Sequence, residues 1–287
     1  MRAQVSRLPG GRLHLNDGPI DLIVSCDGQQ WEVARAEQAA IARFASILDE
    51  LCAELVLLRQ PPCDQQPIGR VARRMWSATR GYGGSVFITP MAAVAGAVAE
   101  EVLEVMLGSA ALLRASVNNG GDIALHLAPQ QNYRIGIIGR PDRPSLFATA
   151  DITHGDNVRG IATSGWRGRS FSLGIADAVT VLAANASAAD AAATMIANAV
   201  SIADHPEILR IPASELQPNS DLGEIPVTRS VGHLTEDEIK FALDAGQCLA
   251  GDLVRHAVIE GCCIRLATQS RLITAPHLAK LESLGHA

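Results

Sequence analysis

Two adjoining strand patterns, joined by a tight turn, limit the fold of this chain more than any other feature. Apolar and polar residues alternate over residues 113–117, and the same period of two returns over residues 123–127. The residues between them, 118–122, read Asn-Asn-Gly-Gly-Asp and supply the Asn-Gly chemistry of a β-hairpin turn. We therefore expect an antiparallel sheet, in which a third strand over residues 133–138 completes a meander.

Helical patterns lie on both sides of these strands. Residues 35–59 carry apolar side chains at helical spacing, and Thr89-Pro90 places a capping threonine before a proline at the first helical position. Further helices are expected over residues 187–202 and after Thr235, where Thr-Glu-Asp-Glu forms a capping box. Further strands are expected over residues 12–16, 21–26, 145–150, 160–163, 178–183 and 263–267, the last of them as the closing strand, and an irregular stretch is expected over 203–232. This order of elements predicts an α+β fold, with antiparallel sheets packed with helices.

The composition bounds the class of protein. Of the 287 residues, 48% are hydrophobic and 3% aromatic, so the core must be closely packed from small aliphatic side chains. A formal net charge of −6 argues against a nucleic-acid-binding protein, whose binding face needs an excess of Lys and Arg. Because no apolar run reaches the ~20 residues of a membrane span and the start does not resemble a signal peptide, we expect a cytoplasmic protein without a membrane partner. The six cysteines are then expected to be free thiols, with a zinc site as the less favoured alternative.

Two glycine-containing turns offer polar groups that a nucleotide could contact. The first is the hairpin turn, whose glycines can adopt positive φ and expose backbone amides to a ligand. The second follows a predicted strand, and its two hydroxyl groups could bind phosphate oxygens. Each turn is also compatible with an ordinary structural role. The candidate nucleotide-binding residues are Asn119, Gly120, Gly121 and Asp122 in the first turn and Thr163, Ser164 and Gly165 in the second.

A third candidate lies near the start of the helix expected over residues 187–202. Asp190 and Thr194 are four residues apart, so on a helix both oxygens face the same way. Carboxylate and hydroxyl oxygens are hard donors suited to Mg²⁺, which also bridges phosphate groups. The alternative is structural, because the helix dipole favours an acidic residue in the first turn and threonine can bond to the preceding turn. Spacing alone leaves both interpretations open.

A local concentration of cations follows the proline-rich break at residues 60–67. It contains Arg70, Arg73, Arg74 and Arg80, followed by Gly81, Gly83 and Gly84. Such a segment is compatible with a solvated helix face and a loop. It is also compatible with a rim that receives an anion, because guanidinium groups and exposed backbone amides both favour phosphate.

The order of these short segments resembles that of the ApbE family of flavin transferases. The segments are Asn119-x-Gly121-Asp122-Ile123, then Ile161-Ala-Thr-Ser-Gly165, then Ala189-Asp190-x-x-x-Thr194, with Ala92–Ala97 placed like the glycine-rich helix start of that family. A smaller cytoplasmic branch of ApbE-like proteins is more similar still. That closer likeness lies in Arg80-Gly81, Ile88-Thr-Pro-Met-Ala-Ala-Val-Ala-Gly96 and Ser172-x-Gly174-x-Ala176-Asp177-Ala178.

The resemblance implies a T-fold-like, duplicated α/β architecture, in a single domain over residues 1–287 with a helical insert. It also implies a flavin nucleotide of the FAD type, with Asp190 and Thr194 holding Mg²⁺ at its diphosphate. By the same likeness, residues 119–122 and 163–165 line the nucleotide. The expected partner is therefore a small-molecule ligand, and a homo-oligomer is left open.

One departure from the family bears on activity. Transferases of this family carry His-x-x-Asp-Pro-x-Thr-Gly shortly after Thr-Ser-Gly, and they split the diphosphate of FAD to move FMN onto a threonine of a target protein. Here residues 166–175 read Trp-Arg-Gly-Arg-Ser-Phe-Ser-Leu-Gly-Ile, with neither histidine nor proline. We therefore expect flavin binding without FMN transfer. Two alternatives stay open, an enzyme acting on a pterin-like heterocycle in one-carbon cofactor metabolism and a non-catalytic interaction protein on the same fold.

Overall fold

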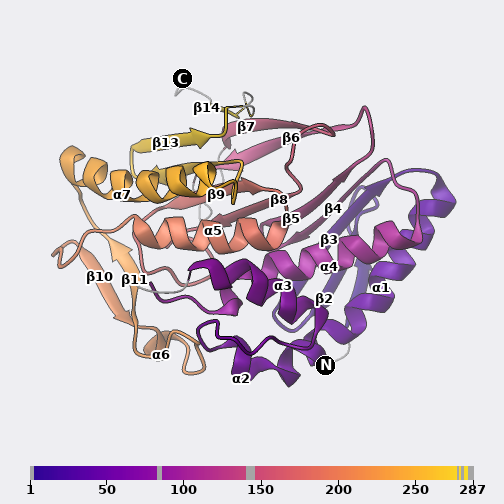
Figure 1. Ribbon diagram of the computed structural model, residues 1–287, viewed down its shortest axis with the longest axis horizontal. Helices are drawn as coiled ribbons and strands as arrows, with labels where there is room; N and C mark the ends of the chain where they lie inside the picture. The colour runs from indigo at the N-terminus through magenta and orange to yellow at the C-terminus, as the bar shows by residue number, and fades with distance from the viewer. Residues whose placement is uncertain (1–2, 83–85, 140–145, 277, 279–280, 284–287) are drawn as a thin grey trace. The chain divides into compact units, whose positions relative to one another are not determined.

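The computed structural model describes residues 3–82, 86–139, 146–276, 278 and 281–283 (Figure 1). Its contacts divide the chain into two compact units. The first unit comprises Met1–Tyr133, Thr153–Ala162 and Ala183–Ala191, and the second comprises Arg134–Ile152, Thr163–Leu182 and Ala192–Ala287.

The first unit contains an antiparallel sheet with the hydrogen-bonded order β1-β2-β3-β4-β5-β8. Its strands are β1 (Gln4–Arg7), β2 (Leu13–Asp17), β3 (Ile20–Asp27), β4 (Arg114–Asn119), β5 (Asp122–Leu127) and β8 (Gly160–Ser164). Burial alternates along β2 and β4, as expected of a sheet with one face turned to a core. The predicted hairpin of residues 113–127 is therefore confirmed.

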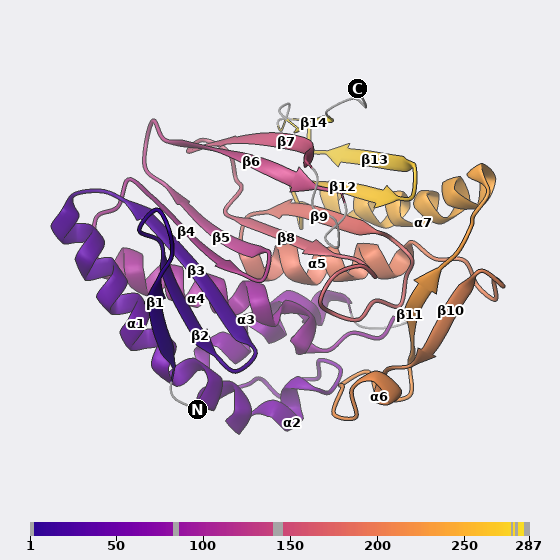
Figure 2. The same cartoon turned by 180° about the vertical axis from the view of Figure 1, so that it is seen from behind.

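Helices cover one face of this sheet, in front of the strands in Figure 1 and behind them in Figure 2. Helices α1 (Gln30–Ala53) and α4 (Val94–Ser109) contact the strands, and α3 (Arg70–Thr79) packs against α4. The other helical elements of the unit are α2 (Leu55–Leu58) and the 3₁₀ turns η1 (Arg80–Tyr82) and η2 (Pro90–Ala93). The core between helices and sheet is aliphatic apart from Phe44, because alternate strand residues meet the apolar stripes of α1 and α4. Its buried members include Leu13, Leu15, Leu22, Val24, Phe44, Ile47, Val98, Val102 and Met106.

Helix α5 (Ala186–Ala199) begins in the first unit. Asn185 precedes it, and its Oδ1 accepts a hydrogen bond from the backbone N–H of Ala188 at 2.8 Å. Gly160 lets β8 approach this start, since a Cβ on Gly160 would lie 2.1 Å from the carbonyl carbon of Asn185. The first turn of α5 is thus fixed against the sheet by a cap and a glycine contact.

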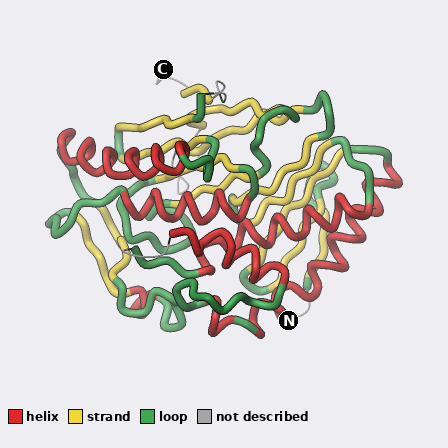
Figure 3. Tube along the Cα trace, viewed as in Figure 1, coloured by secondary structure: helices red, strands yellow, loops and turns green. Residues whose placement is uncertain are grey.

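The second unit contains three groups of strands (Figure 3). One is the three-stranded sheet β14-β7-β6, made by β6 (Asn132–Ile138), β7 (Leu146–Thr153) and β14 (Leu281–Ser283). The second is the antiparallel order β9-β12-β13, made by β9 (Ala178–Ala183), β12 (Gly261–Leu266) and β13 (Gln269–Thr274). The third is the hairpin of β10 (Ile208–Pro212) and β11 (Pro226–Val231), with α6 (Ala213–Leu216) between its strands.

Helix α7 (Glu236–Arg255) packs against β12 and β13. It begins with the predicted capping box, in which the Thr235 hydroxyl accepts from the N–H of Glu238 and the Glu238 carboxylate accepts from the N–H of Thr235. The expected class, α+β with antiparallel sheets packed with helices, is confirmed. A single domain with an internal duplication stays a prediction.

Three expectations about strands are wrong. Residues 133–138 do not complete a meander, because β5 pairs with β8 and β6 belongs to another sheet. The stretch 203–232 is not irregular throughout, because Pro212 and Pro226 sit opposite each other at the end of the β10–β11 ladder, where they interrupt no further pairing. The strand at 263–267 does not close the chain, since β13 and β14 follow it.

Candidate functional site

The start of α4 is the foundation of the candidate site, whose residues Asn119, Asp122 and Asp190 lie in the first unit. As the sequence predicts, Thr89 caps this segment, and its hydroxyl accepts from the N–H of Met91 at 3.3 Å. The first turn is 3₁₀ rather than α-helical. Seven residues after the cap, Gly96 brings the backbone of α4 against the start of α5. A Cβ on Gly96 would lie 2.2 Å from the carbonyl oxygen of Ala186, so only glycine allows this approach.

Substitution of Gly96 tests this contact. We expect Gly96→Ala to lower the free energy of unfolding by about 2–3 kcal/mol, because the overpacking outweighs the gain in helix propensity. The control is Gly108→Ala on the same helix, where a Cβ would meet nothing within 4 Å. That variant should be neutral or more stable by up to about 1 kcal/mol. Urea unfolding measures both, and equal effects at the two positions would contradict the contact.

Asp190 lies on α5 and reaches back to the start of α4. Its Oδ2 accepts a hydrogen bond from the backbone N–H of Gly96 at 2.9 Å. The first turn of a helix presents unpaired N–H groups and a positive partial charge, so a carboxylate is favoured there. The side chain predicted to hold a metal is therefore fixed at the junction of two helix starts.

The hairpin turn reaches the same place. Asn119, 8% exposed, donates from Nδ2 to the carbonyl oxygen of Ala95 at 3.2 Å, one residue before Gly96. Gly120 and Gly121 form the turn with φ of 65° and 118°, values that the sequence predicts for glycines. Asn119 and Asp122 are paired across this turn, so Asp122 stands at the first position of β5.

Two carboxylates therefore converge beside the start of α4. Burial raises the pKa of Asp190 well above its ordinary value, and the nearby charge of Asp122 raises that pKa further. Hydrogen bonds from the N–H groups of Gly96 and Ala95 lower the pKa of Asp190, but the pKa remains raised. A pair of this kind holds either an extra proton or a cation.

The donor set suits a hard cation. Carboxylate oxygens of Asp122 and Asp190 are the preferred ligands of Mg²⁺, and Thr194 follows Asp190 by one turn of α5. Within the described residues no cluster of three or more His, Cys, Asp or Glu side chains could hold a metal ion, so further ligands would be hydroxyl, carbonyl or water oxygens. From the sequence, Asp122 is predicted to contact the nucleotide and not to bind the metal. No spacing signal links it to Asp190, because the hairpin and the helix are 68 residues apart in number.

The second turn lies in the second unit and has contacts of its own. Thr163 Oγ1 and Thr180 Oγ1 are 2.9 Å apart, one donating to the other across β8 and β9. Gly165 has φ of 149°, and a Cβ there would lie 2.7 Å from the carbonyl oxygen of Asp177. These contacts give Thr163 and Gly165 structural roles. Their part in a nucleotide site, with that of Ser164, stays a prediction.

Comparison with known proteins identifies the family. A family model described as "AbpE bacteria" matches residues 5–272. The chain belongs to the ApbE-like family. This ApbE-like chain is 34% identical over 191 residues to a UPF0280 protein of Methanopyrus kandleri, covering 65% of the chain and 73% of that protein. It is 39% identical over 132 residues to a UPF0280 protein of Archaeoglobus fulgidus, covering 46% of the chain and 51% of that protein.

Against the Archaeoglobus protein and several other curated relatives, the match thus spans about half of the relative's length. Among solved structures, the chain is similar to the flavinyl transferase ApbE of Pseudomonas stutzeri in its apo form. The TM-score is 0.44 at 13% identity, over 96% of this chain and 94% of that one. It is also similar to the flavin transferase ApbE of Vibrio cholerae, with a TM-score of 0.39 at 14% identity over 96% and 98% of the two chains.

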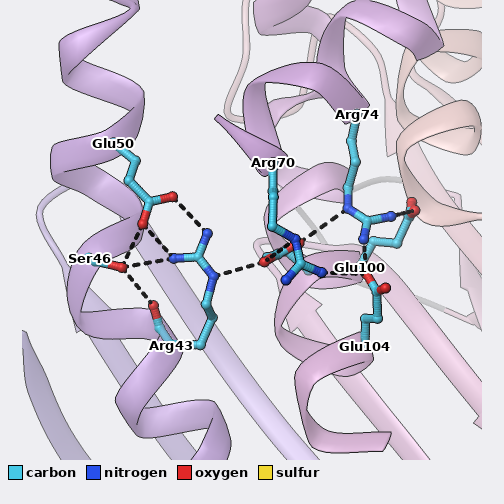
Figure 4. A network of polar contacts seen from close by, with 8 residues as sticks. Arg43, Ser46, Glu50, Arg70, Arg74, Glu100 and Glu104 are labelled. Atoms are coloured by element: carbon cyan, nitrogen blue, oxygen red, sulfur yellow. Dashed lines mark hydrogen bonds and ion pairs between the residues drawn. The ribbon is translucent and has the colours of Figure 1, made fainter. Parts of the chain in front are cut away.

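The arginine-rich segment of this ApbE-like chain does not form an anion-receiving rim at Arg70 and Arg74. Both guanidinium groups enter a network with the glutamates of α4 (Figure 4). Arg80 instead stacks over the ring of Trp76, with 4.9 Å from its Cζ to the ring centroid. Gly83 and Gly84 lie outside the described residues. Of the helices in the described ranges, none is both long and apolar enough to span a membrane.

The segment that departs from the transferases is tied to its own unit. Arg167 stacks on Trp166, with 4.1 Å from its Cζ to the ring centroid, and its Nε donates to Asp177 Oδ1 at 2.5 Å. The other carboxylate oxygen of Asp177 accepts from the N–H of Ala267 at 2.6 Å. Asp177 is 4% exposed. The ion pair thus anchors this ApbE-like loop to the end of β12.

Proposed function

We propose that this ApbE-like chain binds a flavin nucleotide through a divalent metal ion, held by Asp190 with Asp122 and Thr194, and does not transfer FMN. The observation that carries the proposal is that Asp190 and the hairpin turn of Asn119 and Asp122 meet at the start of α4. Asp190 is fixed there by the Gly96 N–H at 2.9 Å. Two carboxylates in one partly buried place repel each other, and a divalent ion converts that repulsion into binding.

The flavin is inferred from the family. The three short segments that resemble the flavin transferases include the hairpin turn and Asp190, which the structure brings together within the first unit. When bound, Mg²⁺ supplies positive charge for the diphosphate of the nucleotide. Residues 119–122 and 163–165 are proposed to contact the nucleotide. Nothing in residues 166–175 replaces the histidine of the transferase stretch, which supports binding without transfer.

Titration calorimetry with FAD, with and without Mg²⁺, tests the proposal. We expect FAD to bind in the presence of Mg²⁺, and Asp190→Asn to weaken this binding by about 10- to 100-fold, since one charged metal ligand is lost. EDTA should weaken FAD binding by the wild-type protein to a similar extent. The control is Asp49→Asn, which neutralises an exposed carboxylate of the same unit on α1.

Each outcome has a distinct meaning. If Asp190→Asn, the wild type in EDTA and the untreated wild type all bind FAD with equal affinity, the metal has no role in binding and that part of the proposal is wrong. If the wild type does not bind FAD, the proposed flavin ligand is wrong. A rise in melting temperature with a pterin and none with FAD would favour an enzyme acting on that heterocycle. No response to either ligand would favour a non-catalytic interaction protein.

A further inference from the structure

Helix α4 carries a network of glutamates that begins at Glu100, one turn beyond Gly96. At its centre Glu101 is 0% exposed and is contacted by three guanidinium groups, with its carboxylate oxygens 2.8 Å from Arg43 Nε, 3.4 Å from Arg70 Nε and 3.3 Å from Arg74 Nε. Arg74 also pairs with Glu100 and Glu104. Because these partners come from α1, α3 and α4, the network locks three helices of the first unit together (Figure 4).

Among the residues that the structure describes, Glu100 is the glutamate of this network that contacts α5. The Oε2 of Glu100 accepts from the hydroxyl of Ser187 at 2.9 Å and from the N–H of Ser187 at 3.3 Å. Arg74 holds the other oxygen of Glu100. By contrast, Glu50 lies at the far end of the network and accepts hydrogen bonds from Arg43 and Ser46.

The spacing along both helices connects this contact to the carboxylate pair. Gly96 and Glu100 are four residues apart on α4, so they share a face. Ser187 and Asp190 are three residues apart on α5 and share a face as well. Two contacts therefore join these faces, one from Glu100 to Ser187 and one from Gly96 to Asp190.

We infer that Glu100, oriented by Arg74, is a positioning residue that sets where Asp190 stands relative to Asp122 and the start of α4. It acts through Ser187 and the first turn of α5 and touches neither the metal nor the nucleotide. This inference rests on the proposed function for its consequence in binding. Groups behind the first ligands commonly change metal affinity by about 10- to 100-fold when removed.

The experiment compares three variants of the full chain with Mn²⁺ alone as the probe. Electron paramagnetic resonance measures the concentration of free Mn²⁺. We expect Glu100→Ala to weaken Mn²⁺ binding about tenfold. Glu100→Gln should weaken binding less than Glu100→Ala does, because its amide oxygen still accepts from Ser187 while its NH₂ group cannot accept from Arg74. Glu50→Ala is the matched control, since it removes a carboxylate from the same network away from α5, and it should leave the affinity unchanged.

A second readout does not depend on metal binding. The N–H of Gly96 reports on the contact with Asp190, so its hydrogen exchange in the metal-free protein should accelerate in Glu100→Ala and not in Glu50→Ala. If Glu100→Ala does not fold, Ser187→Ala takes its place, with the same acceleration expected from the loss of the hydroxyl contact.

The outcomes separate the two proposals. If the wild type binds no Mn²⁺ while Gly96 exchange responds to Glu100→Ala alone, the metal site fails and the positioning role holds. If Mn²⁺ binds the wild type and both readouts are unmoved by Glu100→Ala, the positioning role is overturned and the metal site survives. Equal changes in Mn²⁺ affinity and Gly96 exchange in Glu100→Ala and Glu50→Ala would also overturn the positioning role, because they would reflect a general destabilisation of the helices.

Discussion

The substitution Asp190→Asn should make the metal-free protein more stable at neutral pH. Burial and the charge of Asp122 raise the pKa of Asp190, so the folded state binds this proton more tightly than the unfolded state. The stability gained from the protonated carboxyl is fully present below the ordinary aspartate pKa. It is lost as pH rises through the raised value, so at pH 7 the native aspartate costs the folded protein stability.

Asp190→Asn removes that destabilisation and keeps an oxygen that can accept from the N–H of Gly96. We expect the free energy of unfolding to rise by about 1–2 kcal/mol at pH 7, which corresponds to about 2–4 °C in melting temperature. The difference should shrink as the pH falls through the raised pKa and vanish near pH 3. Mg²⁺ should stabilise the wild type and not the variant.

Thermal unfolding of both proteins between pH 3 and pH 8, in EDTA and in Mg²⁺, measures these effects. Asp49→Asn serves again as the exposed control and should follow the wild type at every pH. A lower melting temperature for Asp190→Asn at pH 7 in EDTA would show that the carboxylate stabilises the fold. That result would argue against repulsion between Asp122 and Asp190.

The second large effect concerns Glu101. Its carboxylate is fully buried among Arg43, Arg70 and Arg74. Removing one partner from a buried ionic group leaves the other charges without compensation, which costs about 3–5 kcal/mol. We therefore expect Glu101→Ala to lower the free energy of unfolding by this amount and to unfold the protein at markedly lower urea concentrations.

The comparison is Glu104→Ala, in which the lost side chain is 54% exposed and pairs with two of the same arginines. Water screens that pair, so the loss should stay below about 1 kcal/mol. Urea unfolding at low and high salt measures both variants. A loss of less than 1 kcal/mol in Glu101→Ala would mean that the arginines relax into solvent when their central partner is gone.

Local features of the structure could be predicted from the sequence because their causes are local. The hairpin at residues 113–127, the cap at Thr89 and the capping box at Thr235 each depend on residues within a few positions of one another. The pairing of β5 with β8 could not be predicted in this way. It joins Ile123 to Ile161 across 38 positions, and an intervening strand pattern over 133–138 offered an equally plausible neighbour.

The candidate site shows the same division. The sequence supplied Asn119, Asp122 and Asp190 as polar groups at a turn and a helix start. The structure adds that Asn119 contacts Ala95 and that Asp190 contacts Gly96, across 24 and 94 positions. Helical spacing on α4 alone does not show that Glu100 meets Ser187 on another helix. Such contacts follow from tertiary packing, which no short pattern encodes.

The positive ends of α4 and α5 are already satisfied by the protein's own acceptors. In α5 these are Asn185 and Glu100, and in α4 they are Thr89 and Asp190. Many nucleotide-binding proteins use a bare helix end as the counter-charge for phosphate. With both ends engaged, recognition of a diphosphate here would fall to the ion itself. Nucleotide binding would then depend on the concentration of free magnesium, and chelation of the ion would release the nucleotide.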